Sequence, residues 1–154
     1  MEEINYMTEG KKKELESELD FLKTFKRKEI VEALEAAKAL GDLSENSEYH
    51  EARDQQGRTE DRIREVENLL KTAVIVKKHT SSQVEVGVSV KVKKAGDKEE
   101  IIYHIVGAQE SDMASNKISY KSPLGQALMG KKKGEEFNLK TPKGLVKYTL
   151  IDIQ

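Results

Sequence analysis

Residues 46–73 carry an apolar pattern that alternates steps of three and four along the chain. A pattern of this kind, kept over several turns, predicts one long helix whose apolar side chains pack on another helix as a coiled coil. Only Gln56 and Thr59 place polar side chains in it. We interpret this seam as packing and assign no chemistry to it. Its members are Tyr49, Ala52, Gln56, Thr59, Ile63, Val66, Leu70 and Ala73.

A first long helix is predicted over residues 8–40, which are rich in Lys, Glu, Leu and Ala and contain no proline. Gly41 is expected to end this helix at the C′ position. Two long helices joined by a few residues pair as an antiparallel hairpin, and at 1.5 Å per residue the arm would be roughly 40–45 Å long. The apolar stripe of the first helix opens in a 4,3 pattern and then drifts, through Leu15, Leu19, Leu22, Phe25, Ile30, Leu34 and Ala37.

The composition agrees with a long exposed helix pair. Of the 154 residues, 36% are charged, 36% are hydrophobic and only 5% are aromatic. These fractions indicate a large surface for the volume and one or two small domains. The chain has no cysteine, which excludes disulfides, a thiolate nucleophile and metal sites with Cys ligands.

The net charge of −1 hides a difference between the two halves. Residues 1–76 carry 13 Lys and Arg against 19 Asp and Glu, whereas residues 77–154 carry 14 against 9. A domain that coats duplex DNA normally has a dense basic face, so bulk nucleic-acid binding is not favoured. The first residues lack the apolar region of a signal peptide, and no stretch approaches the ~18–20 apolar residues that span a bilayer. We expect a soluble, cytoplasmic protein with no membrane partner.

After residue 78 the pattern changes to the period of two that is typical of strands. We therefore predict an α+β protein with an arm over residues 1–76, a small β-rich domain over 77–154 and a linker at 80–82. Strands are expected within 84–92, 101–105, 118–120, 137–139 and 148–153, a short helix at 123–129, and turns at 93–97 and 141–144.

The predicted hairpin tip, residues 41–57, is strongly acidic, with Arg53 as its only full positive charge. Helix capping by Ser44 and carboxylates in a first helical turn would explain most of this acidity, and we assign Glu48, Glu51 and Asp54 to that role or to simple solvation. The acidic side chains follow one another at intervals of three: Asp42, Glu45, Glu48, Glu51 and Asp54.

Asp42 and Glu45 differ from the other tip acids because they lie in or beside the turn. Carboxylates there can act as oxygen ligands for a hard cation such as Mg²⁺. Two ligands on a turn do not complete a Mg²⁺ shell, so a metal role would need further ligands from a partner. The three histidines, His50, His79 and His104, do not have the spacing of a zinc site, and the chain contains no P-loop, GxGxxG or GxSxG motif.

The tip sequence GDLSENSEYHEARDQQG resembles the bacterial Gre transcript-cleavage factors, and most closely their GreA branch. The preceding EIVEALEAAKAL and the following NLLKTAVIV extend the resemblance along both helices. In the second domain, KISYKSPLGQALMGKKKGEEFNLKTPKG resembles the family's segment for binding RNA polymerase. The resemblance covers residues 6–153.

This resemblance implies an arm that enters the secondary channel of bacterial RNA polymerase, carried by an FKBP-like docking domain. Asp42 and Glu45 match the acidic pair that helps the polymerase bind its second catalytic Mg²⁺, so that backtracked RNA is hydrolysed near its 3′ end. Lys38 and Arg53 match basic residues that approach the RNA. The factor would act as a monomer, meet the DNA of the elongation complex only indirectly, and be an accessory factor instead of an enzyme.

The docking contact is predicted at Ser122, Pro123 and Leu124, because a rigid X-Pro turn that presents an apolar residue suits an interface. Capping of a short helix by Ser122, with Pro123 at N1, is an equally good and compatible interpretation. Three other functions are considered: a channel binder that inhibits without cleavage, a coiled-coil chaperone or adaptor, and a stand-alone Mg²⁺ hydrolase. The intact acidic pair argues against the first. A chaperone or adaptor would need exposed apolar residues at the tip, where only Leu43 and Tyr49 are available. A stand-alone hydrolase would need more Mg²⁺ ligands than the tip supplies.

Overall fold

The computed structural model describes residues 3–154 and divides into two compact units. The helical unit, here called the arm, spans Lys12–Thr72. The globular unit combines the N-terminal residues up to Lys11 with Ala73–Gln154. The predicted α+β class, a helical hairpin with a β-rich domain, is confirmed. In chain order the elements are β1 (Asn5–Met7), α1 (Glu9–Phe21), η1 (Leu22–Lys26), α2 (Arg27–Lys38), α3 (Ser47–Lys71), β2 (Ala73–Ile75), β3 (Ser89–Lys94), β4 (Glu100–Val106), η2 (Ala108–Glu110), η3 (Met113–Ser115), β5 (Lys117–Ser119), α4 (Pro123–Leu128), β6 (Glu136–Thr141) and β7 (Gly144–Ile153).

The compact units do not follow the predicted division between residues 76 and 77, because the chain enters and leaves the arm through two strands of the globular unit. β1 runs parallel to β2, with Tyr6 opposite Val74. A Cβ atom on Gly107 would lie 1.8 Å from the carbonyl oxygen of Tyr6, so only glycine allows β1 to pack here. Both strands were missed from the sequence because three residues are too few to show an alternating pattern. The expected linker at residues 80–82 likewise belongs to the globular unit.

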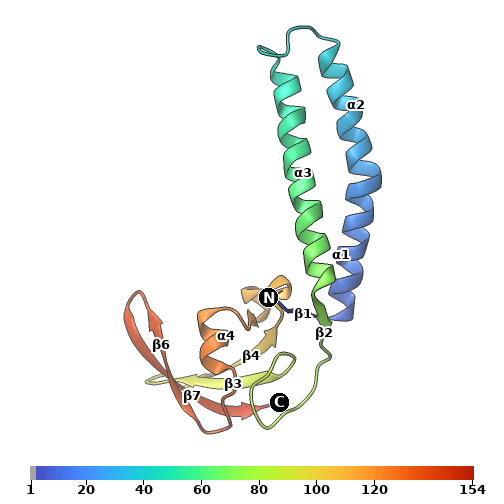
Figure 1. The fold of residues 1–154 in the computed structure, drawn as a ribbon. Coiled ribbons are helices and arrows are strands. Elements are labelled where there is room, and N and C mark those ends of the chain that lie inside the picture. Colours follow the sequence, from blue (N-terminus) through green and yellow to red (C-terminus); the bar gives the residue numbers. More distant parts are fainter. Residues whose placement is uncertain (1–2) are drawn as a thin grey trace. The chain divides into compact units, whose positions relative to one another are not determined.

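The arm is a helical hairpin in which α3 lies beside α1 and α2 and runs in the opposite direction (Figure 1). The predicted seam of α3 is confirmed over most of its length by the burial of Ala52, Thr59, Ile63 and Val66. Near the base Leu69 is the buried leucine in place of the expected Leu70. The seam therefore holds the hairpin together as the sequence predicts.

The first half of the hairpin, which faces α3, is not one regular helix, because a π-helical turn, η1, separates α1 from α2. In this turn the Arg27 N–H donates to the Leu22 carbonyl, five residues earlier in place of four. Buried Leu15 and Ala37 are 22 positions apart, one more than three heptads. The π-turn absorbs that extra residue and keeps both ends of the stripe facing α3. The drift of the sequence pattern has this cause, and Phe25, expected on the stripe, is 61% exposed.

Ion pairs between the two sides of the hairpin add little to its stability. The Arg27 guanidinium donates to both Glu60 oxygens, at 2.7 and 2.8 Å, and Arg62 makes the same two-pronged contact with Glu18 at 2.6 and 2.9 Å. These side chains are about one-third or more exposed, and exposed ion pairs contribute only about 0.2–1 kcal/mol each. The apolar seam is therefore the main source of arm stability, and the ion pairs help to set its register.

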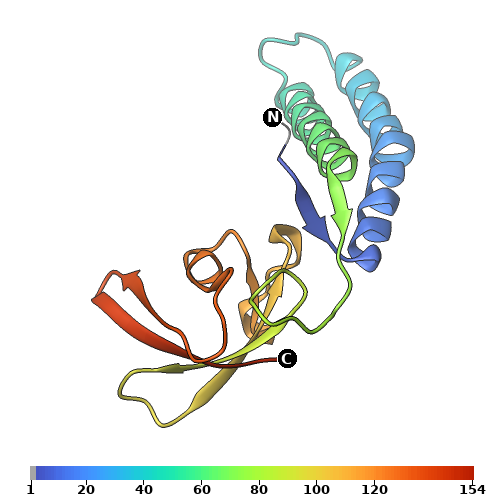
Figure 2. The same cartoon turned by 60° about the horizontal axis from the view of Figure 1, so that its bottom comes forward.

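The globular unit is built on a five-stranded sheet in the order β5-β4-β3-β7-β6, antiparallel except for β4 and β5. The sheet curves around α4, which contacts both edge strands, β5 and β6 (Figure 1, Figure 2). The predicted strands and the short helix are confirmed from residue 89 onward. Residues 84–88 are not a strand, because a turn closed by the Val88 N–H and the Glu85 carbonyl interrupts the extended run. Their valines still enter the core, which contains Val84, Val86, Val88, Val90, Val92, Ile105, Ile118, Leu128, Phe137 and Leu150.

The π-turn leads to a first prediction: deleting Thr24 should leave the arm folded. The deletion removes the spare residue, so the seam on both sides of it keeps its register and the π-turn becomes an ordinary α-turn. Thr24 is exposed and its hydroxyl donates only to the Asp20 carbonyl of its own helix. We expect the free energy of unfolding, measured with urea by far-UV circular dichroism, to change by less than about 1 kcal/mol.

Deletion of Arg64 is the matched control, because it removes an exposed residue from the regular helix α3. The seam residues beyond it would rotate away from the partner helices, so we expect a loss of at least ~3 kcal/mol, the cost of one large core truncation. Equal losses of unfolding free energy for the two deletions would show that the π-turn does not accommodate a spare residue.

Candidate functional site: the tip of the arm

The turn between α2 and α3 carries the two carboxylates that the sequence singled out. Asp42 and Glu45 both lie in this turn, outside either helix, and both are exposed. Gly41 adopts a φ of +122°, which turns the chain out of the first helix, although it lies two residues beyond the C-cap Ala39 and not at the expected C′ position. The turn therefore presents Asp42 and Glu45 at the end of the arm, as predicted.

Asp42 is held in place by Ser44. Its Oδ1 atom accepts a hydrogen bond from the Ser44 backbone N–H at 3.0 Å and another from the Ser44 hydroxyl at 2.9 Å. These bonds, the backbone one first, lower the pKa of Asp42 below its ordinary value. Both bonds use Oδ1, and within residues 3–154 the structure gives Oδ2 no hydrogen bond. Ser44 thus holds the Asp42 carboxylate through Oδ1, and Oδ2 remains open to other contacts.

Asn46 ties the turn to both helices, a role that the sequence analysis missed. Its side-chain oxygen accepts from the Tyr49 N–H at 3.0 Å, which makes Asn46 the N-cap of α3. Its side-chain amide donates to the Ala37 carbonyl at 2.6 Å, across the turn. Ser44, which was expected to cap the helix, donates its hydrogen bonds to Asp42 instead. The signal was present, because Asn immediately before a helical run is a preferred N-cap.

The remaining charged tip residues lie on the helices. Glu48 is in the first turn of α3, as expected, where the helix dipole favours a carboxylate. Glu51 accepts from the Gln55 amide at 3.3 Å. Lys38 ends α2, and the Arg53 guanidinium donates to Gln56 of its own helix at 2.8 Å. Lys38 and Arg53 are therefore exposed on different helices, and the structure records no contact between them.

The donor set at the tip fits part of the coordination shell of a hard cation. Carboxylate oxygens are the ligands that Mg²⁺ prefers, and the carboxylate of Asp42, like that of an ordinary aspartate, is ionised at neutral pH. Across residues 3–154, no three His, Cys, Asp or Glu side chains gather in a way that could hold a metal ion. A hard cation held at Asp42 and Glu45 would therefore need further ligands from outside residues 3–154.

The segment predicted for docking begins α4. The Ser122 hydroxyl accepts from the Gly125 N–H at 3.1 Å and donates to the Ser119 carbonyl at 2.7 Å, and Pro123 occupies the first turn. The capping interpretation is thus confirmed. Leu124 is half-buried against the core, whereas Pro123 is exposed. Of the three residues, Pro123 is the one that presents apolar surface.

Comparison with known proteins decides the family. A model described as "Transcription elongation factor, N-terminal" matches residues 5–75, and one described as "Transcription elongation factor, GreA/GreB, C-term" matches residues 79–154. Transcription elongation factor GreA of Clostridium botulinum (strain Alaska E43 / Type E3) is 50% identical over 148 residues, which cover 95% of this chain and 92% of that protein. The chain belongs to the GreA/GreB family of transcription elongation factors.

Other GreA/GreB relatives match over a similar length. GreA of Clostridium novyi (strain NT) is 47% identical and covers 96% of this chain and 94% of its own, and GreA of Thermoanaerobacter pseudethanolicus is 45% identical with 95% and 94% covered. Among solved structures, Gfh1 of Thermus aquaticus matches with 26% identity and a TM-score of 0.45, covering 100% of this chain and 99% of that one.

Throughout residues 3–154, no helix has the length and apolar character needed to cross a membrane.

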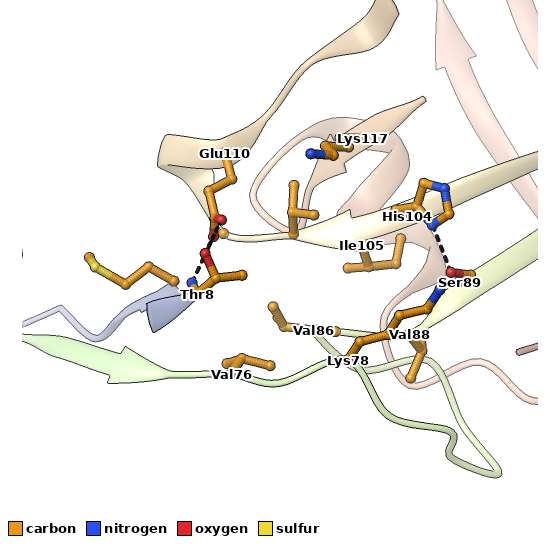
Figure 3. Close-up of a pocket in the computed structure, with 14 residues that line it drawn as sticks. Thr8, Val76, Lys78, Val86, Val88, Ser89, His104, Ile105, Glu110 and Lys117 are labelled. Carbon is orange, nitrogen blue, oxygen red and sulfur yellow. Dashed lines mark hydrogen bonds between the residues drawn. The ribbon is translucent and has the colours of Figure 1, made fainter. Parts of the chain in front are cut away.

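This GreA/GreB chain also has an apolar pocket of about 300 Å³ in its globular unit (Figure 3). None of the predicted site residues lines it. Two polar pairs border it: Glu110 accepts from the Thr8 N–H at 2.9 Å, and the Ser89 hydroxyl lies 2.7 Å from His104 Nδ1. Ser89 and His104 are direct cross-strand neighbours, so their contact follows from the register of β3 and β4. The pairs have a structural role: they satisfy polar groups beside the core and link β1 to η2.

The contacts of Asn46 lead to a second prediction. Asn46→Ala removes the cap oxygen and the donor to the Ala37 carbonyl, so the arm should lose about 1–2 kcal/mol in urea unfolding. Asn46→Asp keeps the cap oxygen and should lose less. Ser44→Ala, at the position first expected to cap the helix, should stay within about 0.5 kcal/mol. A larger loss for Ser44→Ala than for Asn46→Ala would contradict the assignment of the cap.

The Asp42 turn leads to a third prediction, which concerns pH. Because the folded-state pKa of Asp42 is lowered, its bonds to Ser44 are fully formed above the ordinary Asp pKa and are lost as the pH falls through the lower folded value. NMR titration of the Asp42 carboxyl carbon should give a pKa below the reference of about 3.9, with the Ser44 amide shift following the same curve. In Ser44→Ala the pKa should rise only partly, since the backbone bond remains. An Asp42 pKa at or above the reference would contradict the turn geometry.

Proposed function

We propose that this chain is a transcript-cleavage elongation factor, which enters the secondary channel of bacterial RNA polymerase and stimulates Mg²⁺-dependent hydrolysis of backtracked RNA. The observation that carries the proposal is the exposed Asp42 carboxylate, ionised and fixed by Ser44, with exposed Glu45 three residues further in the same turn. Membership of the GreA/GreB family supports the same conclusion.

The length of the arm suits delivery of this pair to a buried site. Helix α3 has 25 residues, which corresponds to about 37 Å of helix at 1.5 Å per residue. The apolar seam and the crossing bond of Asn46 keep the two helices together up to the turn. A narrow, stiff arm of this length can carry two carboxylates through a channel that a globular domain cannot enter.

At the polymerase, Asp42 and Glu45 would add oxygen ligands to a site completed by the polymerase. When bound there, a second Mg²⁺ ion would supply the charge stabilisation that two-metal phosphodiester hydrolysis requires. Ser44 fixes the orientation of Asp42, so this ligand arrives already ordered. Lys38 and Arg53 would lie near the RNA phosphates, with Arg53 exchanging its bond to Gln56 for one to phosphate.

The chain would therefore be an accessory factor and not an enzyme by itself, because the tip supplies too few ligands to hold Mg²⁺ tightly. Pro123, with its neighbours Ser122 and Leu124, is the proposed polymerase contact of the globular unit. We infer that the factor acts as a monomer on the polymerase and the nascent RNA 3′ end, and meets the DNA of the elongation complex only through the polymerase.

The fourth prediction tests the acidic pair in a stalled, backtracked elongation complex supplied with Mg²⁺. Asp42→Asn and Glu45→Gln keep side-chain size and remove the negative charge that a hard cation needs. Each should reduce the rate of RNA shortening by at least ~10²-fold, comparable to the loss of one transition-state stabiliser of ~2.7–4 kcal/mol. Higher Mg²⁺ should restore part of the rate by mass action. Both variants should still compete with the wild-type factor for polymerase.

Glu51→Gln is the matched control, because Glu51 lies on α3 and its carboxylate already bonds Gln55. Its loss should stay below about tenfold, a step worth ~1.4 kcal/mol. Normal cleavage by Asp42→Asn together with failure of Glu51→Gln would show that the active pair is assigned wrongly. Binding of the wild-type protein without any RNA shortening would favour the inhibitory channel binder.

A further inference from the structure

Two aromatic side chains lie on the surface of the arm where the π-turn begins and ends. The rings of Phe21 and Phe25 stack with centroids 5.3 Å apart and an interplanar angle of 23°. Their exposed fractions are 50% and 61%. Neither ring takes part in the seam, where Leu22 and Ile30 supply the apolar side chains on this part of the hairpin. The pair therefore contributes a ready-made aromatic surface and little to the packing of the arm.

Leaving this surface in water is unfavourable. Full burial of a Phe side chain is worth about 1.5–3 kcal/mol, and half or more of each ring remains exposed. Apart from the turn at the tip, the π-turn is the one place within residues 12–71 where the chain departs from regular α-helix. Single π-turns inside α-helices occur frequently at functional sites. An aromatic pair at such a turn suggests a surface that is covered by a partner.

The charges around the rings indicate what kind of partner this is. Single-stranded nucleic acid binds where aromatic side chains lie in a groove with free positive charge. Here the neighbouring cations are each paired with a carboxylate of the arm, so the rim is polar but offers no unpaired cation. An apolar centre with such a rim is typical of a protein contact. The pairs are Lys23 with Glu67, Lys26 with Glu29, Arg27 with Glu60, and Lys28 with Glu32.

The size of the surface argues against a second copy of the chain. A fully buried aromatic side chain covers about 150–250 Å², so two half-exposed rings can contribute roughly 250 Å² per chain. Stable interfaces bury about 1,200–2,000 Å² in total. The pair is therefore too small to hold a complex alone. It suits one anchor in a contact whose other parts lie elsewhere on the same chain.

We propose that Phe21 and Phe25 form a mid-arm anchor that binds an apolar recess in the protein wall of the polymerase channel and fixes the depth of the tip. This proposal rests on the proposed function. Lys38 ends α2 and lies 13 residues after Phe25 and 17 after Phe21, so the anchor lies about 20–26 Å of helix behind the turn that carries Asp42. If the tip reaches the catalytic site as proposed, this part of the arm would lie within the channel. The recess is predicted to be apolar, because the anchor itself offers two exposed aromatic rings.

The test compares the double variant Phe21→Ser/Phe25→Ser with the wild-type factor over a range of concentrations in the RNA-shortening assay. The factor concentration for half-maximal cleavage should rise at least tenfold, while the maximal rate at saturation should stay within about threefold, since Asp42 and Glu45 are untouched. Urea unfolding should show that the arm still folds, because half or more of each Phe residue is exposed. An unchanged half-maximal concentration with normal wild-type cleavage would overturn the anchor and leave the proposed function intact.

Val31→Ser is the matched control, because Val31 is 48% exposed on α2 and is not part of the stacked pair. It should raise the half-maximal concentration less than threefold. An effect as large as that of the double variant would overturn the proposal, since any exposed apolar residue would then serve equally. If the wild-type factor neither binds polymerase nor shortens RNA, the proposed function and the anchor fail together.

A photo-crosslinking phenylalanine analogue at position 25 of the full chain identifies the occupant directly. Crosslinks to a polymerase subunit in the elongation complex support the proposal. Crosslinks mainly to RNA or DNA, or to a second copy of the factor, overturn it. The same analogue at position 31 is the control for non-specific contact and should give a much weaker product.

Discussion

The apolar seam between α3 and the first two helices is the interaction on which the rest of the arm depends. Its members recur at heptad spacing on α3, whereas the facing stripe contains one residue too many between Leu15 and Ala37. A regular helix would have turned one end of that stripe away from its partner. The π-turn at residues 22–26 removes the mismatch by accommodating five residues in one turn. The irregularity is thus a consequence of preserving the seam, and it also places Phe21 and Phe25 on the surface.

The ends of the arm are set by a different constraint. Before α1 and after α3 the chain passes through β1 and β2, which pair with each other within the globular unit. The close approach of the Tyr6 carbonyl to Gly107 leaves no room for a side chain at that glycine. A fragment cut at residue 77 would therefore lose two strands of the unit that it is meant to isolate. The two family models match residues 5–75 and 79–154, so they divide the chain between residues 75 and 79. The compact units of the structure divide it after residues 11 and 72.

At the other end of the arm, hydrogen bonds within a short turn prepare charged groups for chemistry. Ser44 fixes Asp42 and lowers its pKa, while Asn46 caps α3 and reaches across to α2. The turn therefore orders one carboxylate and its own backbone, and under the proposed function the polymerase would supply the remaining metal ligands. This combination of local order and missing ligands is what a half-site delivered to a partner requires.

The sequence by itself determined the two long helices, the β-rich second domain, the family and the position of Asp42 and Glu45. These features depend on periodicity and on a contiguous motif, both of which act over neighbouring residues. Only the tertiary structure decided the π-turn, the exposure of Phe25, the pairing of β1 with β2 and the bond of Asn46 to Ala37 across the turn. Each of those depends on how separate segments of the chain fit together. The π-turn fits the apolar stripe of α1 and α2 to the seam of α3, and Gly107 faces the carbonyl of Tyr6, about a hundred residues earlier. The side-chain amide of Asn46 reaches across the turn to Ala37. The amino-acid sequence shows the local preferences of neighbouring residues. Contacts between distant segments exist only once the chain has folded.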